Sequence, residues 1–167
     1  MDGSVAIVGY MGSGKSTLGR LLARALDREL VDTDRAVVAK AGMEISEIFA
    51  EHGEKTARDL EHEALREALG GGTPRVVACG GGVVVRPENR ALLRDVPTVF
   101  LQEDMGILYR RTRGPGRPLR AASKEEFESR YRDRLPLYRE VADLEVDVAG
   151  RTPARVAEEV LGWLSIR

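Results

Sequence analysis

Cysteine is almost absent from this chain of 167 residues, which contains only Cys79. A single thiol excludes an internal disulfide framework and fits a reducing compartment such as the cytoplasm. Long apolar runs are lacking as well: none is long enough to cross a bilayer, and none precedes the first predicted strand as a secretory leader would. We therefore expect a cytoplasmic protein that has no membrane as a partner.

An excess of charge of either sign is also missing. Lysine and arginine together number 26 and aspartate and glutamate 27, which gives a formal net charge of −1. Aromatic residues make up only 5% of the chain, and no basic surface with interleaved aromatic residues is evident. Both features disfavour nucleic acid as a partner. The hydrophobic content of 43% is that of an ordinary globular protein, and the length of the chain predicts one domain over residues 1–167. We expect this domain to be a monomer.

The most informative stretch is Gly9-Tyr10-Met11-Gly12-Ser13-Gly14-Lys15-Ser16-Thr17. It matches G-x-x-x-x-G-K-[ST] between an apolar run over residues 5–8 and a helical apolar pattern over residues 15–26. In this motif the curled backbone directs N–H groups at phosphates, the lysine reaches the β- and γ-phosphates, and the serine binds Mg²⁺. A simple strand-to-helix turn would not need both Lys15 and Ser16. The stretch predicts a nucleoside triphosphate site made by Gly12, Ser13, Gly14, Lys15, Ser16 and Thr17.

Two carboxylates end the second predicted strand, which covers residues 29–31 and leads into Asp32-Thr33-Asp34. Because strand side chains alternate, Asp32 and Asp34 cannot both point the same way. One can face the metal of the nucleotide and the other a neighbouring pocket. A structural role is also open for Asp34, as the N-cap of a helix over residues 35–40, whereas no such role is expected for Asp32.

A helical pattern follows, with a short helix over residues 46–52, a break at Gly53 and a longer helix over residues 54–69. Arg58 and Glu61 are three residues apart and could pair, although periodicity alone favours a solvated helix face for both. His52 and His62 have no partners at metal-ligand spacing, so we expect both on the surface.

Three glycines, Gly80, Gly81 and Gly82, follow a buried strand predicted over residues 75–79. Glycines at a strand end allow a ligand to approach the backbone closely, and a permissive turn is the alternative. Cys79 is expected to be a small buried apolar side chain, because no neighbouring base activates it.

The stretch over residues 110–120 carries five arginines and no acidic residue. Glycine and proline interleaved with arginine suit a flap that closes on polyphosphate, and an exposed loop is the alternative. Further elements are predicted as helices over 87–93, 104–111 and 123–141, strands over 98–101 and 144–148, and a helix after Thr152-Pro153. Pro136 is expected to kink or interrupt the helix over 123–141.

Strands alternate with helices, which predicts an α/β fold with a parallel sheet that is covered on both faces. Gly9, Asp32 and Gly80 each follow a predicted strand, so they meet at one carboxyl edge of the sheet, where ligands bind. The arrangement brings together what phosphoryl transfer requires: phosphate binding, metal binding, and positioning of an acceptor.

Several motifs along nearly the whole chain resemble the shikimate kinase family. They are Gly9 to Thr17, Asp32-Thr33-Asp34, Gly53-Glu54 with Arg58 and Glu61, Gly80-Gly81-Gly82, Arg117-Pro118-Leu119, and Arg134-Leu135-Pro136-Leu137-Tyr138. The resemblance implies a three-layer P-loop kinase fold of the nucleoside-monophosphate-kinase-like type, with a five-stranded parallel sheet in the order 2-3-1-4-5. It also implies a substrate-binding subregion over residues 33–62, a mobile lid over residues 112–124, and phosphorylation of the 3-hydroxyl of shikimate by ATP with Mg²⁺.

The resemblance also assigns roles to particular residues. Lys15, Asp34 and Arg117 would be catalytic, with Arg117 reaching the transferred phosphoryl group from the lid. Shikimate would be bound by Asp34, Arg58, Gly80, Gly81, Gly82 and Arg134. Asp32 would hold Mg²⁺ through water beside Ser16. ATP would be bound by the P-loop residues and Arg117, and Arg111, Arg151 and Pro153 would flank its adenine.

Three positions depart from the family pattern. Ala57 stands where the family usually has a phenylalanine that lines the shikimate pocket, Arg120 replaces a leucine in the lid, and Cys79 replaces a small or hydroxyl residue. Ala57 motivates an alternative function, a kinase for another small hydroxy acid such as gluconate, with Phe49 expected near the same pocket. A non-catalytic nucleotide-binding module is the other alternative. A guanine-specific switch is excluded, because Asn89 is the only asparagine and the Asn-Lys-x-Asp signature cannot occur.

Overall fold

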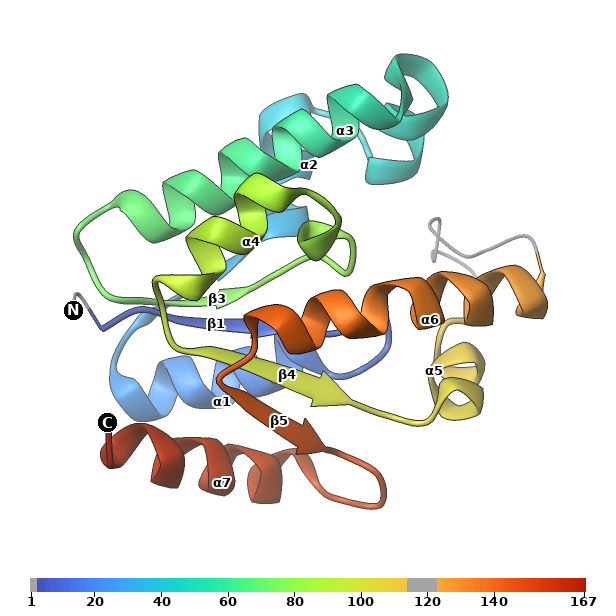
Figure 1. Ribbon diagram of the computed structural model, residues 1–167. Helices are drawn as coiled ribbons and strands as arrows, with labels where there is room; N and C mark the ends of the chain where they lie inside the picture. The colour runs from blue at the N-terminus through green and yellow to red at the C-terminus, as the bar shows by residue number, and fades with distance from the viewer. Residues whose placement is uncertain (1–2, 114–122) are drawn as a thin grey trace.

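The computed structural model describes residues 3–113 and 123–167 (Figure 1). Within these residues, five strands form one parallel sheet in the order β2-β3-β1-β4-β5. The strands are β1 (Val5–Val8), β2 (Glu29–Asp32), β3 (Arg75–Ala78), β4 (Thr98–Gln102) and β5 (Leu144–Asp147). The predicted fold class and strand order are therefore confirmed.

Helices cover both faces of the sheet, which gives three layers (Figure 1). The helices are α1 (Lys15–Leu26), α2 (Thr33–Ala41), α3 (Ile45–Gly70), α4 (Pro87–Arg94), α5 (Met105–Arg111), α6 (Lys124–Val141) and α7 (Pro153–Ser165), with a short 3-10 helix, η1 (Val83–Val85). Helices α1 and α7 pack on one face, and α3, α4 and α6 on the other. None of the helices among the described residues has the length and apolarity needed to cross a membrane.

Strand β1 explains why the sheet needs both layers. Val5 and Ile7 pack into the core beneath α1 and α7, whereas Ala6 and Val8 pack into the core beneath α3 and α6. All four side chains are buried, so the strand has a continuous apolar sequence instead of an alternating one. The loop that follows β1 is thereby fixed at the carboxyl edge of the sheet.

Two helix irregularities were anticipated, and one of them is confirmed. Helix α3 contains a break at Gly53, whose φ of 82° and ψ of 170° lie outside the helical region. Helix α6, in contrast, continues through Pro136, so of the two predicted outcomes, a kink or an interruption, the interruption is wrong. Pro136 and Arg132, whose carbonyl loses its helical partner, both lie on the exposed side of α6, where water can bind that carbonyl.

Candidate active site

The loop between β1 and α1 has the backbone shape of a phosphate cradle. Gly12 and Gly14 have φ values of 83° and 95°, a region that strains other residues. Gly14 is the N-cap of α1, and no side chain caps this helix end. The first N–H groups of α1 are therefore available to an anion, as the sequence motif predicts.

Lys15 lies inside this loop and is bound to it. Its Nζ donates a hydrogen bond to the backbone carbonyl of Tyr10 at 2.9 Å. Burial lowers the Lys15 pKa to about 8, although the carboxylates of Asp34 and Asp32 act in the opposite direction. A substrate phosphate would meet a lysine that is already positioned and that still carries its charge at neutral pH.

This pKa leads to a prediction for the pH dependence of the phosphoryl transfer that the sequence motifs predict. Below pH 8 Lys15 is protonated and can attract phosphate, and as pH rises through about 8 it loses that charge. We expect kcat/KM for ATP to fall above about pH 8, by about tenfold per unit, because this constant reports the free enzyme. Initial rates at low ATP across a pH series measure it. A profile that stays flat up to the ordinary lysine pKa of 10.5 would contradict the assignment.

Asp32 joins the P-loop to the beginning of α2. Its Oδ2 accepts a hydrogen bond from the Ser16 hydroxyl at 3.0 Å, and its Oδ1 accepts from the backbone N–H groups of Asp34 and Arg35. Asp32 is thus the N-cap of α2, and the expectation that Asp34 could be the cap is wrong. Because the extended backbone of Asp32 lets its two oxygens serve both neighbours, Asp34 remains available to face the cavity.

Asp34 lies between the P-loop and the triple-glycine loop. Burial raises its pKa, an effect that Lys15 and Arg58 oppose and Asp32 reinforces. A Cβ built on Gly80 would overlap Oδ1 of Asp34, so no side chain fits at that position. Glycine is needed at this position because a larger side chain would collide with Asp34. The sequence alone could not distinguish this steric requirement from a need for an unusual backbone conformation.

Arg58 and Glu61 form an ion pair on the cavity side of α3, with 3.0 Å between Nη1 and Oε2. Their side chains are only 18% and 8% exposed, so the expectation of a solvated helix face is wrong. The Arg58 guanidinium also lies over the Phe49 ring, 5.4 Å from its centroid. Burial raises the Glu61 pKa and Arg58 opposes this shift, which favours the charged pair.

Two hydroxyl groups fix the triple-glycine loop, and sequence analysis assigned a role to neither. Thr33 accepts a hydrogen bond from the Gly80 N–H at 2.9 Å, and Tyr138 donates one to the Gly81 carbonyl at 2.5 Å. Burial raises the Tyr138 pKa, so its hydroxyl keeps its proton. None of the three glycines has a positive φ, which argues against the alternative of a permissive turn. The loop is a rigid wall of the site.

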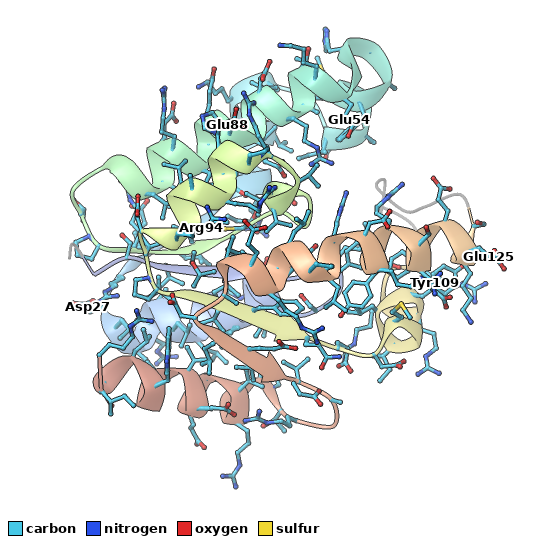
Figure 2. The ribbon with its side chains drawn as sticks, viewed as in Figure 1. Asp27, Glu54, Glu88, Arg94, Tyr109 and Glu125 are labelled. Atoms are coloured by element: carbon cyan, nitrogen blue, oxygen red, sulfur yellow. The ribbon has the colours of Figure 1, made fainter. Side chains whose placement is uncertain are left out.

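A cavity of about 870 Å³ is lined by several of these residues, among them Asp34, Arg58, Glu61, Gly81 and Gly82. Asp34, Arg58 and Arg134 are among its charged residues, and the Arg134 guanidinium lies 5.7 Å from the centroid of the Tyr10 ring. The other charged residues in the lining are Arg35, Glu44, Glu54, Glu61 and Arg130. Its apolar lining includes Val37, Val38, Ile45, Ile48, Phe49 and Ala57. The expectation that Phe49 lies near Ala57 is thus confirmed. Glu54 also lines the cavity, and Figure 2 shows it on α3.

Other predicted site residues are not part of the cavity lining or fall outside the described residues. Arg111 donates to the Gly12 carbonyl from the end of α5. Arg151 binds the Asp147 carbonyl and Glu159, and Pro153 begins α7, so both lie beyond the carboxyl end of β5. Arg117, Arg120 and residues 114–122 of the expected lid are outside the described residues.

The two histidines and the cysteine lie outside the proposed chemistry. His52 is exposed as expected, but His62 is half-buried, with Nδ1 2.7 Å from Oδ1 of Asn89. The expectation of a surface position is therefore met by His52 and only in part by His62. Asn89 in turn donates to the Val83 carbonyl, which ties α3 to η1 through α4. Cys79 is buried and its pKa is raised to about 12 by burial, which confirms an inert apolar role.

Comparison with known proteins supports the family resemblance that the sequence motifs indicate. The family model described as shikimate kinase matches residues 11–165. A shikimate kinase from Rhodococcus jostii (strain RHA1) is 38% identical over 168 residues, 99% of each chain. A solved structure of shikimate kinase from Acinetobacter baumannii in complex with shikimate is 31% identical and superposes with a TM-score of 0.88 over 97% of this chain and 92% of its own. A gluconokinase from Sinorhizobium meliloti, at 17% identity and a TM-score of 0.55 over 98% and 92% of the two chains, shares the fold alone.

Proposed function

Because the chain belongs to the shikimate kinase family, it is an ATP-dependent kinase for the 3-hydroxyl of shikimate, and we propose how its residues divide that task. The observation that carries the proposal is the position of Asp34. Its carboxylate lines the acceptor cavity and is influenced by the charges of both Lys15 and Arg58. One carboxylate thus lies between the group that would bind phosphate and the group that would bind the acceptor.

We propose that Arg58 and Arg134 bind the carboxylate of shikimate. Both guanidinium groups line the cavity, and planar paired donors suit a carboxylate. Glu61 and Phe49 hold Arg58, and the Tyr10 ring supports Arg134. The N–H of Gly81, with Gly80 and Gly82 on either side, would complete the contact to the substrate.

Asp34 then orients the acceptor hydroxyl and removes its proton. The hydroxyl oxygen attacks the γ-phosphorus, the bond from that phosphorus to the β–γ bridging oxygen breaks, and its electron pair leaves with ADP. The proton passes to Asp34, whose pKa is raised by burial and is therefore better matched to this role.

The nucleotide is proposed to bind with its phosphates in the loop of Gly12, Ser13, Gly14, Lys15, Ser16 and Thr17. Lys15 and Arg117 would stabilise the transferred charge, and Arg111, Arg151 and Pro153 would flank the adenine. Ser16 and Asp32 offer only oxygen ligands, which suits Mg²⁺, and Asp32 would bind the ion through water. When bound, the ion would neutralise charge on the β- and γ-phosphates. Phosphate oxygens and water would supply its other ligands, because the described residues contain no cluster of three metal-binding side chains.

Residues 33–62 are proposed to form the substrate-binding subregion and residues 112–124 the lid of a single domain over residues 1–167. The first assignment is supported by the cavity lining, which includes residues from Asp34 to Glu61 of α2 and α3. A monomeric state, a cytoplasmic location and the lack of a nucleic-acid partner stay predictions from the sequence.

The proposed acceptor is tested by measuring ADP release with shikimate, quinate, gluconate or no acceptor. We expect strong stimulation by shikimate and little by gluconate, because the two arginines bind a carboxylate while Asp34 needs a hydroxyl that a ring holds at a fixed distance from that carboxylate. Release without an acceptor provides the control for simple ATP hydrolysis. Strong stimulation by gluconate and not by shikimate would overturn the assignment and would favour the substrate class that Ala57 suggested.

A further inference from the structure

A buried carboxylate that the proposed mechanism does not use lies just after strand β4. The Glu103 side chain is 1% exposed, and burial of a carboxylate is costly unless the charge is paired and hydrogen-bonded. Its Oε1 accepts a hydrogen bond from the backbone N–H of Asp104 at 2.9 Å. Its Oε2 makes no hydrogen bond within the described part of the chain and lies 3.3 Å from Nη2 of Arg111. The charge of Glu103 is therefore balanced mainly by one guanidinium.

The same guanidinium contacts the P-loop. While Nη2 of Arg111 faces Glu103, Nη1 donates a hydrogen bond to the Gly12 carbonyl at 3.1 Å. Arg111 is the last residue of α5, and its side chain is 48% exposed. One side chain thus joins a buried acid after β4 to the rim of the phosphate cradle, with part of its surface accessible to a ligand.

The backbone around this bridge is closely packed. A Cβ built on Gly12 would lie 3.3 Å from both the Leu108 carbonyl oxygen and Cγ2 of Thr112. Tyr109 of α5, labelled in Figure 2, packs edge-on against Phe127 of α6 with 5.3 Å between ring centroids. Because α5 and the loop are already fixed in this way, the freedom that Glu103 removes is that of the long Arg111 side chain.

We propose that Glu103 is a positioning residue for nucleotide binding, which holds the Arg111 guanidinium at the P-loop rim in the orientation that receives the adenine. The inference rests on the proposed role of Arg111 beside the nucleotide. An arginine ordered before binding does not lose its rotamer freedom when the ligand arrives, so affinity increases. Glu103 touches neither nucleotide nor acceptor in this scheme and acts only through Arg111.

The test measures ADP affinity by isothermal titration calorimetry, without acceptor, for the wild-type enzyme, Glu103→Gln, Arg111→Ala and the double variant. Glu103→Gln keeps the size of the side chain and an acceptor for the Asp104 N–H, but removes the charge that orients Arg111. We expect its Kd for ADP to rise about five- to tenfold. The double variant should bind ADP as Arg111→Ala does, because Glu103 has no effect once its partner is gone.

Steady-state kinetics provide a second readout. In Glu103→Gln the KM for ATP should rise with the Kd for ADP, while kcat and the KM for shikimate stay within about twofold. Arg94→Ala is the control: it removes the same charge from the exposed end of another helix, α4, whose residues are not among those lining the cavity, and it should leave the Kd for ADP within about twofold. If Glu103→Gln folds poorly, Arg111→Lys replaces it, because an ammonium keeps the charge but lacks the fork that joins Glu103 to Gly12.

An unchanged Kd in Glu103→Gln or, where it is needed, in Arg111→Lys would overturn the proposal. An equally large effect of Glu103→Gln in the Arg111→Ala background would also overturn it, because the acid would then act through the fold. Failure of the proposed function would look different: the wild-type enzyme would bind ADP normally but would not turn over shikimate.

Discussion

Asp34→Asn should reduce kcat with shikimate by about 10²- to 10⁴-fold, the range for loss of a positioned general base. Asparagine has nearly the same shape, so the cavity wall and the Asp32 cap of α2 should survive, but an amide cannot take the proton of the acceptor hydroxyl. The measurement is initial-rate ADP release at saturating shikimate and ATP. Affinity for ADP should stay within about threefold of the wild-type value, because the phosphate cradle is untouched.

The pH dependence of this variant gives an independent check. Asp34 raises the Lys15 pKa, so its neutralisation should move the alkaline fall of kcat/KM for ATP to lower pH than in the wild-type enzyme. Rates should therefore be compared near pH 7. Turnover of Asp34→Asn within about tenfold of wild-type would remove Asp34 from the proton transfer.

The second large effect is expected for Gly82→Ala. The φ of −92° and ψ of −1° at Gly82 are values that alanine adopts readily, so the substitution causes no backbone strain. The new methyl group, however, would overlap Nη1 of Arg58 and lie 2.7 Å from its Cζ. The guanidinium must then leave its position beside Glu61, and we expect the KM for shikimate to rise by about 10- to 100-fold, the effect of lost hydrogen bonds to a charged group.

Two comparisons separate this effect from a general loss of stability. Gly70→Ala adds the same methyl group where nothing lies within 4 Å, and its KM for shikimate should equal that of the wild-type enzyme. In an Arg58→Ala background, Gly82→Ala should add little, because the side chain that it displaces is gone. A normal KM for shikimate in the Gly82→Ala single variant would show that Arg58 does not need its observed position.

The local sequence predicted the structure correctly where a short stretch determines its own conformation. Helix α1 begins and ends at the predicted residues, Lys15 and Leu26, because glycines precede it and its apolar spacing is regular. The break of α3 at Gly53 was likewise evident from the sequence. The strand order came from the family resemblance, since alternating strands and helices are compatible with several orders.

The errors arose where a distant residue decides the outcome. Arg58 and Glu61 have the spacing of a solvated pair, but the packing of α3 around the cavity buries them. Asp32 caps α2 and binds Ser16 at the same time, a double use that no local pattern indicates. Tyr138 and Gly81 are 57 residues apart in sequence, so their hydrogen bond depends on how α6 packs beside the triple-glycine loop.

The close packing of the triple-glycine loop limits which mutations its codons can tolerate. Every base change in a glycine codon that replaces the residue adds at least a Cβ, and at Gly80 and Gly82 that atom would overlap Asp34 or Arg58. No missense mutation at these two codons is therefore conservative. An inhibitor that fills the acceptor cavity would contact Gly81 and Gly82. A single mutation at codon 82 could not change the shape of that contact surface without displacing Arg58, the arginine proposed to bind the substrate.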